Sequence, residues 1–297
     1  MKFAISSVLS AASAAILVAL SVVQVAALPM SADSPATGLQ KRTISGINNY
    51  NCKLTAAHPR PLILVHSTLL TVDSWWEFAP VLIKNGYCVF GLTYGLYPTI
   101  PGFGGLASVE SSAQELATFA DNVLAKMNVT QVDIVGHSQG GILARYWMKY
   151  LDGAGKVYRH IGISPITHGT TLDSLATWAK AWGVFAPLSA FFNVIAPSFP
   201  EMVSGSTFMT ELNDGGDTAS GVIFSNIATK YDEVVTPYTT CFQEDTGVTN
   251  VVLQNLCILS LNEHLTMVNS FVVLRFVLNQ LDPSNAKTVN CLNLISA

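Results

Sequence analysis

Short apolar runs alternate along the chain with longer segments in which apolar residues recur at helical spacing. The apolar runs predict six strands, at residues 62–66, 87–92, 132–136, 157–164, 222–229 and 251–254. The helical spacing predicts four helices, at residues 75–85, 109–127, 139–151 and 265–281. Each strand is apolar throughout rather than alternating, which is typical of strands covered on both faces. The pattern therefore predicts an α/β fold, with a mostly parallel central sheet flanked by helices and joined by right-handed crossovers.

The first 42 residues carry processing signals instead of this pattern. A basic start precedes a long apolar stretch, and Val25-Ala26-Ala27 supplies the small residues of a signal peptidase site. We predict a signal peptide over residues 1–27, and an uncleaved membrane anchor is the alternative. Residues 28–42 are loop-like and end in Lys41-Arg42, which predicts a pro-peptide with a dibasic cleavage site, or else two surface cations in a flexible terminus. Residues 43–297 then form a single secreted, extracellular domain with a large core.

Charged residues are few, at 11% of the chain against a usual quarter. Without residues 1–42, which include three basic side chains and one acidic side chain, the formal net charge is −6. A weakly acidic chain with scattered charges is a poor partner for nucleic acid and for anionic lipid head groups. So few charges on a secreted chain predict apolar surface at a binding site. We expect a monomer that has no stable membrane span once the signal peptide is removed.

Two kinds of secretory modification follow from the sequence. Five cysteines make disulfides the default, and the odd number leaves at least one free or paired between chains. Positions along the chain favour the pairs Cys52–Cys88 and Cys241–Cys257, which leaves Cys291. None has the Cys-x-x-Cys spacing of zinc or redox sites, and we expect neither a metal nor an organic cofactor. The sequon at residues 128–130 predicts a surface glycan on Asn128.

The candidate chemistry begins with Gly-His-Ser-Gln-Gly at residues 136–140, between an apolar strand and a helix. In this G-x-S-x-G context the chain turns sharply and strains the serine backbone, which requires small residues two positions away on either side. Gly136 and Gly140 meet this requirement, and the turn presents the Ser138 hydroxyl above the sheet. The backbone N–H of Gln139 then lies at the positive end of the helix, where it can bind an oxyanion. A glycine-rich strand end without a catalytic role is the alternative interpretation.

A serine hydroxyl needs a base that accepts its proton and a third group that orients the base. After such a strand-to-helix turn, the order along the chain is serine, acid, histidine. His264 has this order and a loop position before the last helix, and a surface histidine at a helix start is the alternative. The elbow is expected to turn the neighbouring His137 away. Asp232 follows the strand at residues 222–229 and is the candidate acid, with Glu233 the next choice.

A second oxyanion donor is expected in the loop after the first strand, which begins at His66. The backbone N–H of Thr68 in this loop, together with its hydroxyl, is the natural partner of the Gln139 N–H. These two groups, contributed by separate loops, would form the oxyanion hole.

Residues 172–208 interrupt the α/β pattern with an aromatic, nearly uncharged segment that three prolines divide. The segment is either a buried pair of helices or a cap beside the active site. We favour a cap or lid whose inner face holds acyl chains, because open α/β folds bind ligands at the carboxyl edge of the sheet. The candidate substrate-binding residues are Trp178, Trp182, Phe185, Leu188, Phe191 and Phe192.

Six stretches of the chain resemble the class 2 secreted lipases, a group of α/β-hydrolases. They are residues 61–66, 86–90, 136–141, 164–170, 229–238 and 263–265, and they extend over most of the chain after residue 50. The resemblance implies an α/β-hydrolase fold and a triad of Ser138, Asp232 and His264, which agrees with the choice made from the residues. It also implies the Cys52–Cys88 and Cys241–Cys257 disulfides.

One position departs from the family pattern, which usually has glycine after the histidine of the oxyanion loop. This chain has Ser67 there. Loss of the glycine can tighten or rotate the loop. A displacement of Thr68 by an ångström would weaken transition-state stabilisation by roughly two orders of magnitude.

The resemblance implies a triacylglycerol lipase, a serine carboxylic-ester hydrolase that acts on lipid at an oil–water interface through an acyl-enzyme. A soluble short-chain esterase or an acyltransferase would use the same triad, so the motif does not separate them. The apolar segment at residues 172–208 favours a lipase, because long acyl chains need an apolar trough. A non-catalytic lipid-binding protein with this fold is the alternative from a different class, and the intact triad argues against it.

Overall fold

A parallel sheet organises the computed structural model, which describes residues 44–98, 101–171, 196–289 and 291. These residues belong to one compact unit, Arg42–Ala297. Within them the sheet has six strands in the order β2-β1-β3-β4-β5-β6, all paired in parallel. The strands are β1 (Leu62–Val65), β2 (Val89–Leu92), β3 (Val132–His137), β4 (Val157–Ile163), β5 (Ile223–Ala228) and β6 (Thr249–Val252). All six predicted strands are confirmed, with ends that differ by one or two residues, and the fold class is the predicted α/β class.

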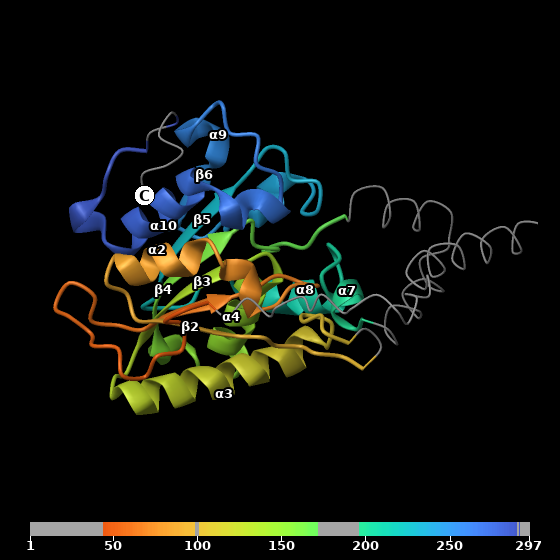
Figure 1. Ribbon diagram of the computed structural model, residues 1–297. Helices are drawn as coiled ribbons and strands as arrows, with labels where there is room; N and C mark the ends of the chain where they lie inside the picture. The colour runs from red at the N-terminus through yellow and green to blue at the C-terminus, as the bar shows by residue number, and fades with distance from the viewer. Residues whose placement is uncertain (1–43, 99–100, 172–195, 290, 292–297) are drawn as a thin grey trace, which may run out of the picture. The chain divides into compact units, whose positions relative to one another are not determined.

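Helices cover both faces of the sheet (Figure 1). Their bounds are α2 (Phe78–Lys84), α3 (Val109–Met127), α4 (Gln139–Tyr150) and α10 (Phe271–Leu281). Alternate residues of β1 enter two separate cores: Ile63 packs with the core that α3 and α4 share, and Leu62 packs with that of α2 and α10. Because both faces of β1 are buried, its sequence is a continuous apolar run.

Local chemistry explains the ends of α3. The Ser108 hydroxyl accepts a hydrogen bond from the backbone N–H of Ser111, and Glu110 lies in the first turn, near the positive end of the helix. Asn128 ends the helix in the left-handed conformation, with φ of 54°. Asn128 is exposed, so the sequon lies on the surface, and the glycan itself stays a prediction.

Two predicted helices are interrupted. The prediction at residues 75–85 becomes the 3-10 helix η1 (Val72–Trp75) followed by α2, and that at residues 265–281 becomes η4 (Leu265–Asn269) followed by α10. Ser270 separates η4 from α10 with an extended backbone, φ −91° and ψ 120°. Apolar periodicity continues through both breaks, which is why the sequence pattern does not show them.

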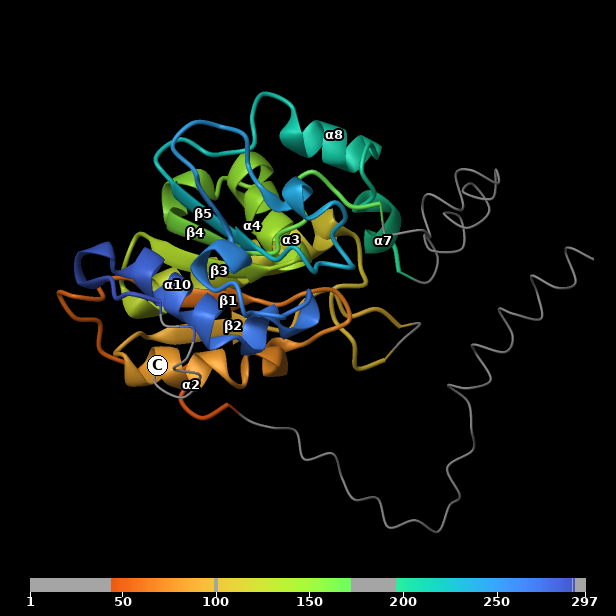
Figure 2. The ribbon, with the colours of Figure 1, turned by 90° about the horizontal axis from the view of Figure 1, so that it is seen from above.

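The remaining described elements are short. They are η2 (Ala154–Lys156), α7 (Ser198–Glu201), α8 (Thr207–Asn213), η3 (Tyr238–Cys241), α9 (Leu253–Leu256) and η5 (Pro283–Asn285). Helices α7 and α8 follow one another, and α8 lies against α4 (Figure 2). Helix α7 lies in the predicted cap segment, residues 172–208, and α8 begins at its end and extends beyond it. The candidate substrate-binding residues of the segment lie outside the described residues: Trp178, Trp182, Phe185, Leu188, Phe191 and Phe192.

The disulfides correct one prediction. Cys52 and Cys88 are bonded as predicted, but Cys257 pairs with Cys291 and not with Cys241. Cys241 is a free, buried thiol in the core of α3 and α4, whereas Cys257 belongs to the core of α2 and α10. The sheet therefore separates the two cysteines that the sequence analysis paired.

No helix in the described part of the chain is long and apolar enough to cross a membrane.

Candidate active site

The G-x-S-x-G motif forms a tight turn between β3 and α4. Ser138 has φ 56° and ψ −121°, a strained backbone for a residue with a side chain. A Cβ atom on Gly136 would lie 2.6 Å from the carbonyl oxygen of Gly140, and a Cβ on Gly140 would collide with the carbonyl oxygen of Val65. The turn is therefore possible only with glycine at both positions, and it places Ser138 at the carboxyl edge of the sheet.

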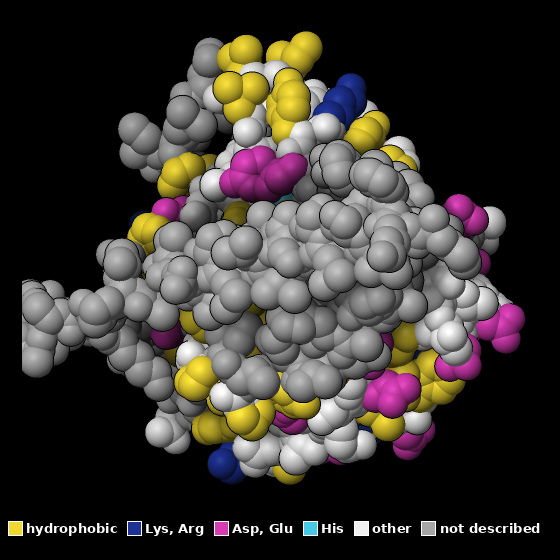
Figure 3. Space-filling model, turned by 90° about the vertical axis from the view of Figure 1, so that its right-hand side faces the viewer, with side chains coloured by type: hydrophobic (Ala, Val, Ile, Leu, Met, Phe, Trp, Pro, Cys, Tyr) yellow, Lys and Arg dark blue, Asp and Glu magenta, His cyan; other side chains and the backbone are white. Residues whose placement is uncertain are grey.

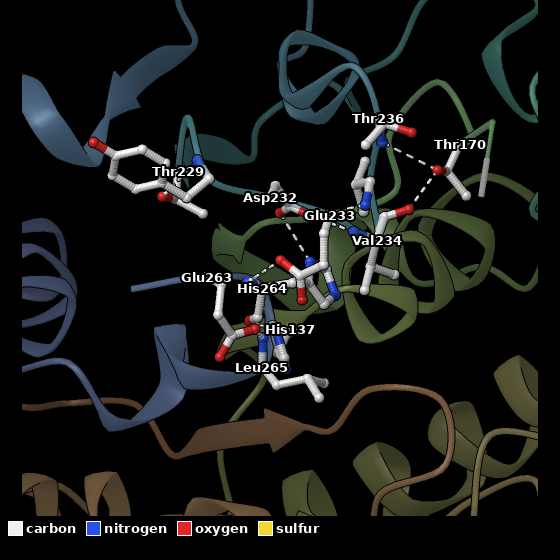
Figure 4. A network of polar contacts seen from close by, with 12 residues as sticks. His137, Thr170, Thr229, Asp232, Glu233, Val234, Thr236, Glu263, His264 and Leu265 are labelled. Carbon is white, nitrogen blue, oxygen red and sulfur yellow. Dashed lines mark hydrogen bonds and ion pairs between the residues drawn. The ribbon is translucent and has the colours of Figure 1, made fainter. Parts of the chain in front are cut away.

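His264 and Asp232 meet at the same edge, from the loops after β6 and β5. His264 Nδ1 lies 2.8 Å from Asp232 Oδ2, and both side chains are buried (Figure 4). The other carboxylate oxygen of Asp232 accepts hydrogen bonds from the backbone N–H groups of Val234 (3.1 Å) and Val235 (2.7 Å). With both oxygens occupied in this way, the carboxylate is fixed as an acceptor for Nδ1–H. The tautomer of His264 is thereby set, and Nε2 is left as the basic nitrogen.

The alternative acid, Glu233, contacts the backbone of His264 and not its ring. Its Oε2 atom accepts a hydrogen bond from the His264 N–H at 3.3 Å. Partial burial, together with a hydrogen bond to Glu263, raises the pKa of Glu233 above its ordinary value. The two neighbouring carboxylates therefore have different partners: Asp232 binds the imidazole of His264, and Glu233 binds the backbone N–H of His264.

His137 has a contact that the sequence analysis missed. Its Nε2–H donates to the carbonyl oxygen of His264 at 3.1 Å, and the two rings lie 5.0 Å apart between centroids. The elbow does not simply turn this side chain away, because it directs the ring toward the loop of the base. His137, the last residue of β3, therefore ties this strand to the loop that carries His264. Its place directly before the serine was the only sequence signal available.

The Nε2 atom of His264 is buried and has no hydrogen-bond partner among the described residues. A buried polar atom without a partner is costly, and such atoms are often functional. In unliganded enzymes the hydrogen bond between nucleophile and base is frequently long and shortens only with substrate bound.

The loop that begins at His66 is held by a polar network around Tyr94. The Tyr94 N–H donates to His66 Nε2 at 3.2 Å, and His66 Nδ1–H donates to the carbonyl oxygen of Ser67 at 2.8 Å. The Tyr94 hydroxyl contacts both the His66 carbonyl oxygen (2.7 Å) and Gln139 Oε1 (3.0 Å). Burial lowers the pKa of His66 to about 4, so the ring stays neutral in this role.

Gly105 joins the two expected oxyanion donors. Its carbonyl oxygen accepts hydrogen bonds from Gln139 Nε2 (3.2 Å) and from the Ser198 hydroxyl of α7 (2.7 Å). Its α-carbon lies so close to Thr68 that an added Cβ would be 2.8 Å from the Thr68 Cα. Gly105 therefore lies against both the Thr68 backbone and the Gln139 side chain, and no signal in the sequence pointed to it. The oxyanion hole formed by the Thr68 and Gln139 N–H groups stays a prediction.

Ser67 does not need the freedom of glycine in this structure. The residue of this loop with positive φ is Leu69, at 62°, and Ser67 is buried without such a conformation. The substitution of glycine by Ser67 is therefore compatible with the loop, and the strain lies two residues further on.

Replacement of Gly105 by alanine is expected to lower kcat for ester hydrolysis by about 100-fold, the loss typical of one oxyanion donor. Gly105 has φ of 69°, and its new Cβ would lie 2.5 Å from Gln139 Oε1, so that Thr68 or Gln139 must move. Gly102→Ala is the matched control, because Gly102 has φ of 87° in the same loop with open space around it. Steady-state kinetics on a soluble ester measure both variants. Equal losses would contradict a role of Gly105 in the spacing of these donors.

Buried histidines are expected to make the fold sensitive to acid. Burial lowers the pKa of His160 to about 3, from an ordinary value of 6.5. Below pH 6.5 the unfolded chain binds a proton here and the folded chain does not, so the free energy of unfolding falls as the pH decreases. Glu201 acts in the opposite direction, because burial raises its pKa to about 7.

A variant isolates the contribution of His160 from that of Glu201. When the pH falls from 7.5 to 5, the free energy of unfolding of His160→Leu is expected to rise by about 2 kcal/mol relative to that of wild type. The reason is that the unfolded variant no longer binds a proton at this position. Urea unfolding of both proteins at the two pH values measures the difference. If the difference in free energy of unfolding between the two proteins is the same at both pH values, then His160 binds its proton equally well in the folded and the unfolded chain. Such a result would contradict the expectation.

No group of three or more histidine, cysteine or acidic side chains in the described part of the chain is arranged to hold a metal ion.

Triacylglycerol lipases are among the known sequences that this chain resembles. Triacylglycerol lipases of Pseudarthrobacter phenanthrenivorans and Burkholderia plantarii are each 31% identical to this chain over 97 residues, which is 31% of the chain. The matches cover 28% and 25% of those proteins. The chain thus spans about a quarter of the length of these two curated relatives.

Solved structures show the same fold. Aspergillus fumigatus lipase B superposes with a TM-score of 0.61 at 21% identity, over 78% of this chain and 54% of that one. The mature form of Bacillus licheniformis lipase BlEst2 gives a TM-score of 0.58 at 16% identity, over 77% and 94%. The architecture is that of the α/β-hydrolases. Residues 59–277, more than half of the chain, match the family Lipase (class 2), and the chain therefore belongs to the class 2 lipase family.

Proposed function

We propose that the protein is a secreted serine carboxylic-ester hydrolase, a triacylglycerol lipase that works through Ser138, His264 and Asp232. The observation that carries this proposal is the buried 2.8 Å contact of His264 Nδ1 with Asp232 Oδ2, at the sheet edge where Ser138 occupies a strained turn. An oriented imidazole at the same edge as a presented serine is what nucleophilic catalysis requires. Membership of the lipase family and the names of the relatives support an ester as the substrate.

In the proposed acylation, Ser138 Oγ attacks the ester carbonyl carbon while His264 Nε2 accepts the serine proton. The backbone N–H groups of Thr68 and Gln139 bind the negative charge that develops on the carbonyl oxygen. His264 then returns the proton to the leaving alcohol, and the acyl group stays on Ser138. Asp232 stabilises the imidazolium during this step without accepting the proton itself.

Deacylation uses the same groups with water as the nucleophile. His264 accepts a proton from water, and the oxygen attacks the acyl carbonyl carbon. When the tetrahedral intermediate collapses, Ser138 leaves with the proton from His264, and the fatty acid is released. This cycle needs neither a metal nor an organic cofactor.

Secretion is part of the proposal. Its support comes from the two disulfides, which form in oxidising compartments, and from the signal-like start of the chain. The preference for long acyl chains over short ones rests on the apolar residues of segment 172–208, most of which lie outside the described residues.

Labelling with a serine-directed phosphonate tests the chemistry, and a rate profile with tributyrin tests the substrate class. We expect the label on the peptide that contains Ser138, and a rate that rises when the substrate exceeds its solubility and forms an emulsion. Saturation below the solubility limit would instead identify a soluble esterase. Absence of both label and hydrolysis would contradict the proposal and favour a lipid-binding protein.

A further inference from the structure

The turn after α9 exposes three large apolar side chains within four residues. Ile258 is 79% exposed, Leu259 65% and Leu261 75%. Side chains of this type are normally buried, and an exposed cluster of them marks an interaction site. We call residues 258–261 the apolar turn. Figure 3 shows hydrophobic side chains gathered at the top of the face that it draws, with acidic side chains below them and a Lys or Arg side chain beside them.

The polar residue of the apolar turn, Ser260, points toward the interior of the protein. Ser260 is only 8% exposed, and its carbonyl oxygen accepts a hydrogen bond from Gln254 Nε2 at 3.2 Å. Its hydroxyl donates to Asn262 Oδ1 at 2.8 Å, and the Asn262 carbonyl oxygen accepts from the Thr229 hydroxyl at 2.7 Å. Polar groups inside and apolar groups outside reverse the usual arrangement of a surface turn.

These contacts also fix the turn. The Ser260 N–H donates to the Cys257 carbonyl oxygen at 3.0 Å, and Cys257 is buried and bonded to Cys291. If the apolar side chains folded inward, they would break the hydrogen bonds of Ser260 and leave buried polar groups unpaired. The three side chains are therefore held toward solvent. Two of them, Leu259 and Leu261, line a hollow of about 380 Å³ together with Phe271 and other residues.

The apolar turn precedes the catalytic base by three residues. His264 is buried, and the next residue, Leu265, is 51% exposed. Figure 4 shows the Leu265 side chain directed away from Asp232 and Glu233. On the oxyanion side, Leu69 follows Thr68 and is also exposed. Apolar side chains therefore stand next to both the base and an oxyanion donor.

Charge selects the kind of surface that fits. Residues 257–271 contain no lysine or arginine, and their acidic side chain is Glu263. Anionic lipids are recognised by basic clusters, which are absent from this segment of the sequence. An uncharged lipid surface requires only exposed apolar side chains of this kind.

We propose that the apolar turn docks the protein on the surface of a neutral lipid and so brings that surface to the His264 loop. The proposal rests on the proposed function, because it names the surface through which a lipase would meet its substrate. It adds residues that touch lipid without touching the reacting ester.

The test measures binding without turnover. In a Ser138→Ala background, Ile258→Ser, Leu259→Ser and Leu261→Ser are combined, and flotation with a triolein emulsion coated with phosphatidylcholine gives the bound fraction. We expect the partition coefficient to fall at least about tenfold, because three apolar side chains no longer leave water. Circular dichroism and thermal melting confirm that the variant is folded.

A matched control carries Ile223→Ser and Tyr150→Ser, which also remove exposed apolar side chains. Ile223 begins β5 and Tyr150 ends α4, so both lie away from the carboxyl edge of the sheet. The control is expected to bind the emulsion as the Ser138→Ala parent does. With Ser138 restored, the rate on the emulsion divided by the rate on a soluble ester is expected to fall about tenfold in the triple variant only.

Several results would overturn the proposal. The triple variant could bind the emulsion as the parent does, or the control could lose as much emulsion binding as the triple variant. The Ser138→Ala parent could also fail to bind the emulsion, or the protein could bind only vesicles of anionic phosphatidylglycerol. A dimer in sedimentation that the triple variant dissociates, with emulsion binding intact, would assign the turn to a second copy of the chain instead. Failure of the proposed function is separate, because it appears as missing phosphonate label while the flotation result still stands.

Discussion

Replacement of Ser138 by alanine is expected to lower kcat for ester hydrolysis by about 10⁶-fold, with the fold unchanged. The variant removes the nucleophile, and removal of a serine nucleophile alone costs about as much as removal of the whole triad. Alanine suits the strained backbone no worse than serine, since both have a Cβ at φ 56°. Single-turnover hydrolysis of a chromogenic ester and phosphonate labelling measure the loss. Residual rates near wild type would exclude Ser138 as the nucleophile.

Ser164 supplies a close control for this experiment. It follows β4, the neighbour of β3 in the sheet, is fully buried and also has a positive φ, of 41°. Its hydroxyl has no hydrogen-bond partner among the described residues. Ser164→Ala is therefore expected to keep activity within about twofold and to melt no lower than wild type, since it removes an unsatisfied buried hydroxyl.

Replacement of Asp232 by asparagine is expected to reduce kcat by about 10⁴-fold, the loss typical of the orienting carboxylate in a serine triad. The carboxylate accepts from His264 Nδ1–H through Oδ2 and from Val234 and Val235 through Oδ1. An asparagine amide would present a donor to one of these groups and stabilise the wrong tautomer of His264. Stopped-flow acylation and steady-state kcat on the same ester measure the effect.

Glu233→Gln tests whether any neighbouring carboxylate would serve. The glutamine keeps an oxygen acceptor for the His264 N–H, and Glu233 does not contact the ring. We expect a loss of less than about fivefold. If Glu233→Gln costs as much as Asp232→Asn, then the negative charge near the loop, and not the contact with Nδ1, supports the base.

The strands were predictable because the fold buries both faces of the sheet. A strand such as β1 leaves a continuous apolar run, and the chain order places Ser138, Asp232 and His264 after the parallel strands β3, β5 and β6. Because parallel strands end at one edge, this order alone indicates that the three residues converge. The structure brings Asp232 and His264 into contact, and the participation of Ser138 stays a proposal.

Contacts between distant segments were not predictable. His137 reaches the His264 carbonyl across 127 positions of sequence, and Gly105 contacts Thr68 and Gln139 from a loop without a recognisable motif. The predicted Cys241–Cys257 disulfide was wrong for a related reason: sequence distance does not tell which face of a sheet a loop occupies. Cys241 and Cys257 are close in the chain but belong to different cores.

The unpaired Cys241 thiol can report local opening of the folded protein. The thiol is fully buried, and this burial raises its pKa well above the ordinary value. The backbone carbonyl oxygen of Cys241 accepts a hydrogen bond from the Thr167 hydroxyl at 2.8 Å. A thiolate forms, and a reagent can reach it, only when this part of the core opens. The rate at which a thiol reagent modifies the native protein therefore measures the free energy needed to open the region beside Asp232. No added label is required.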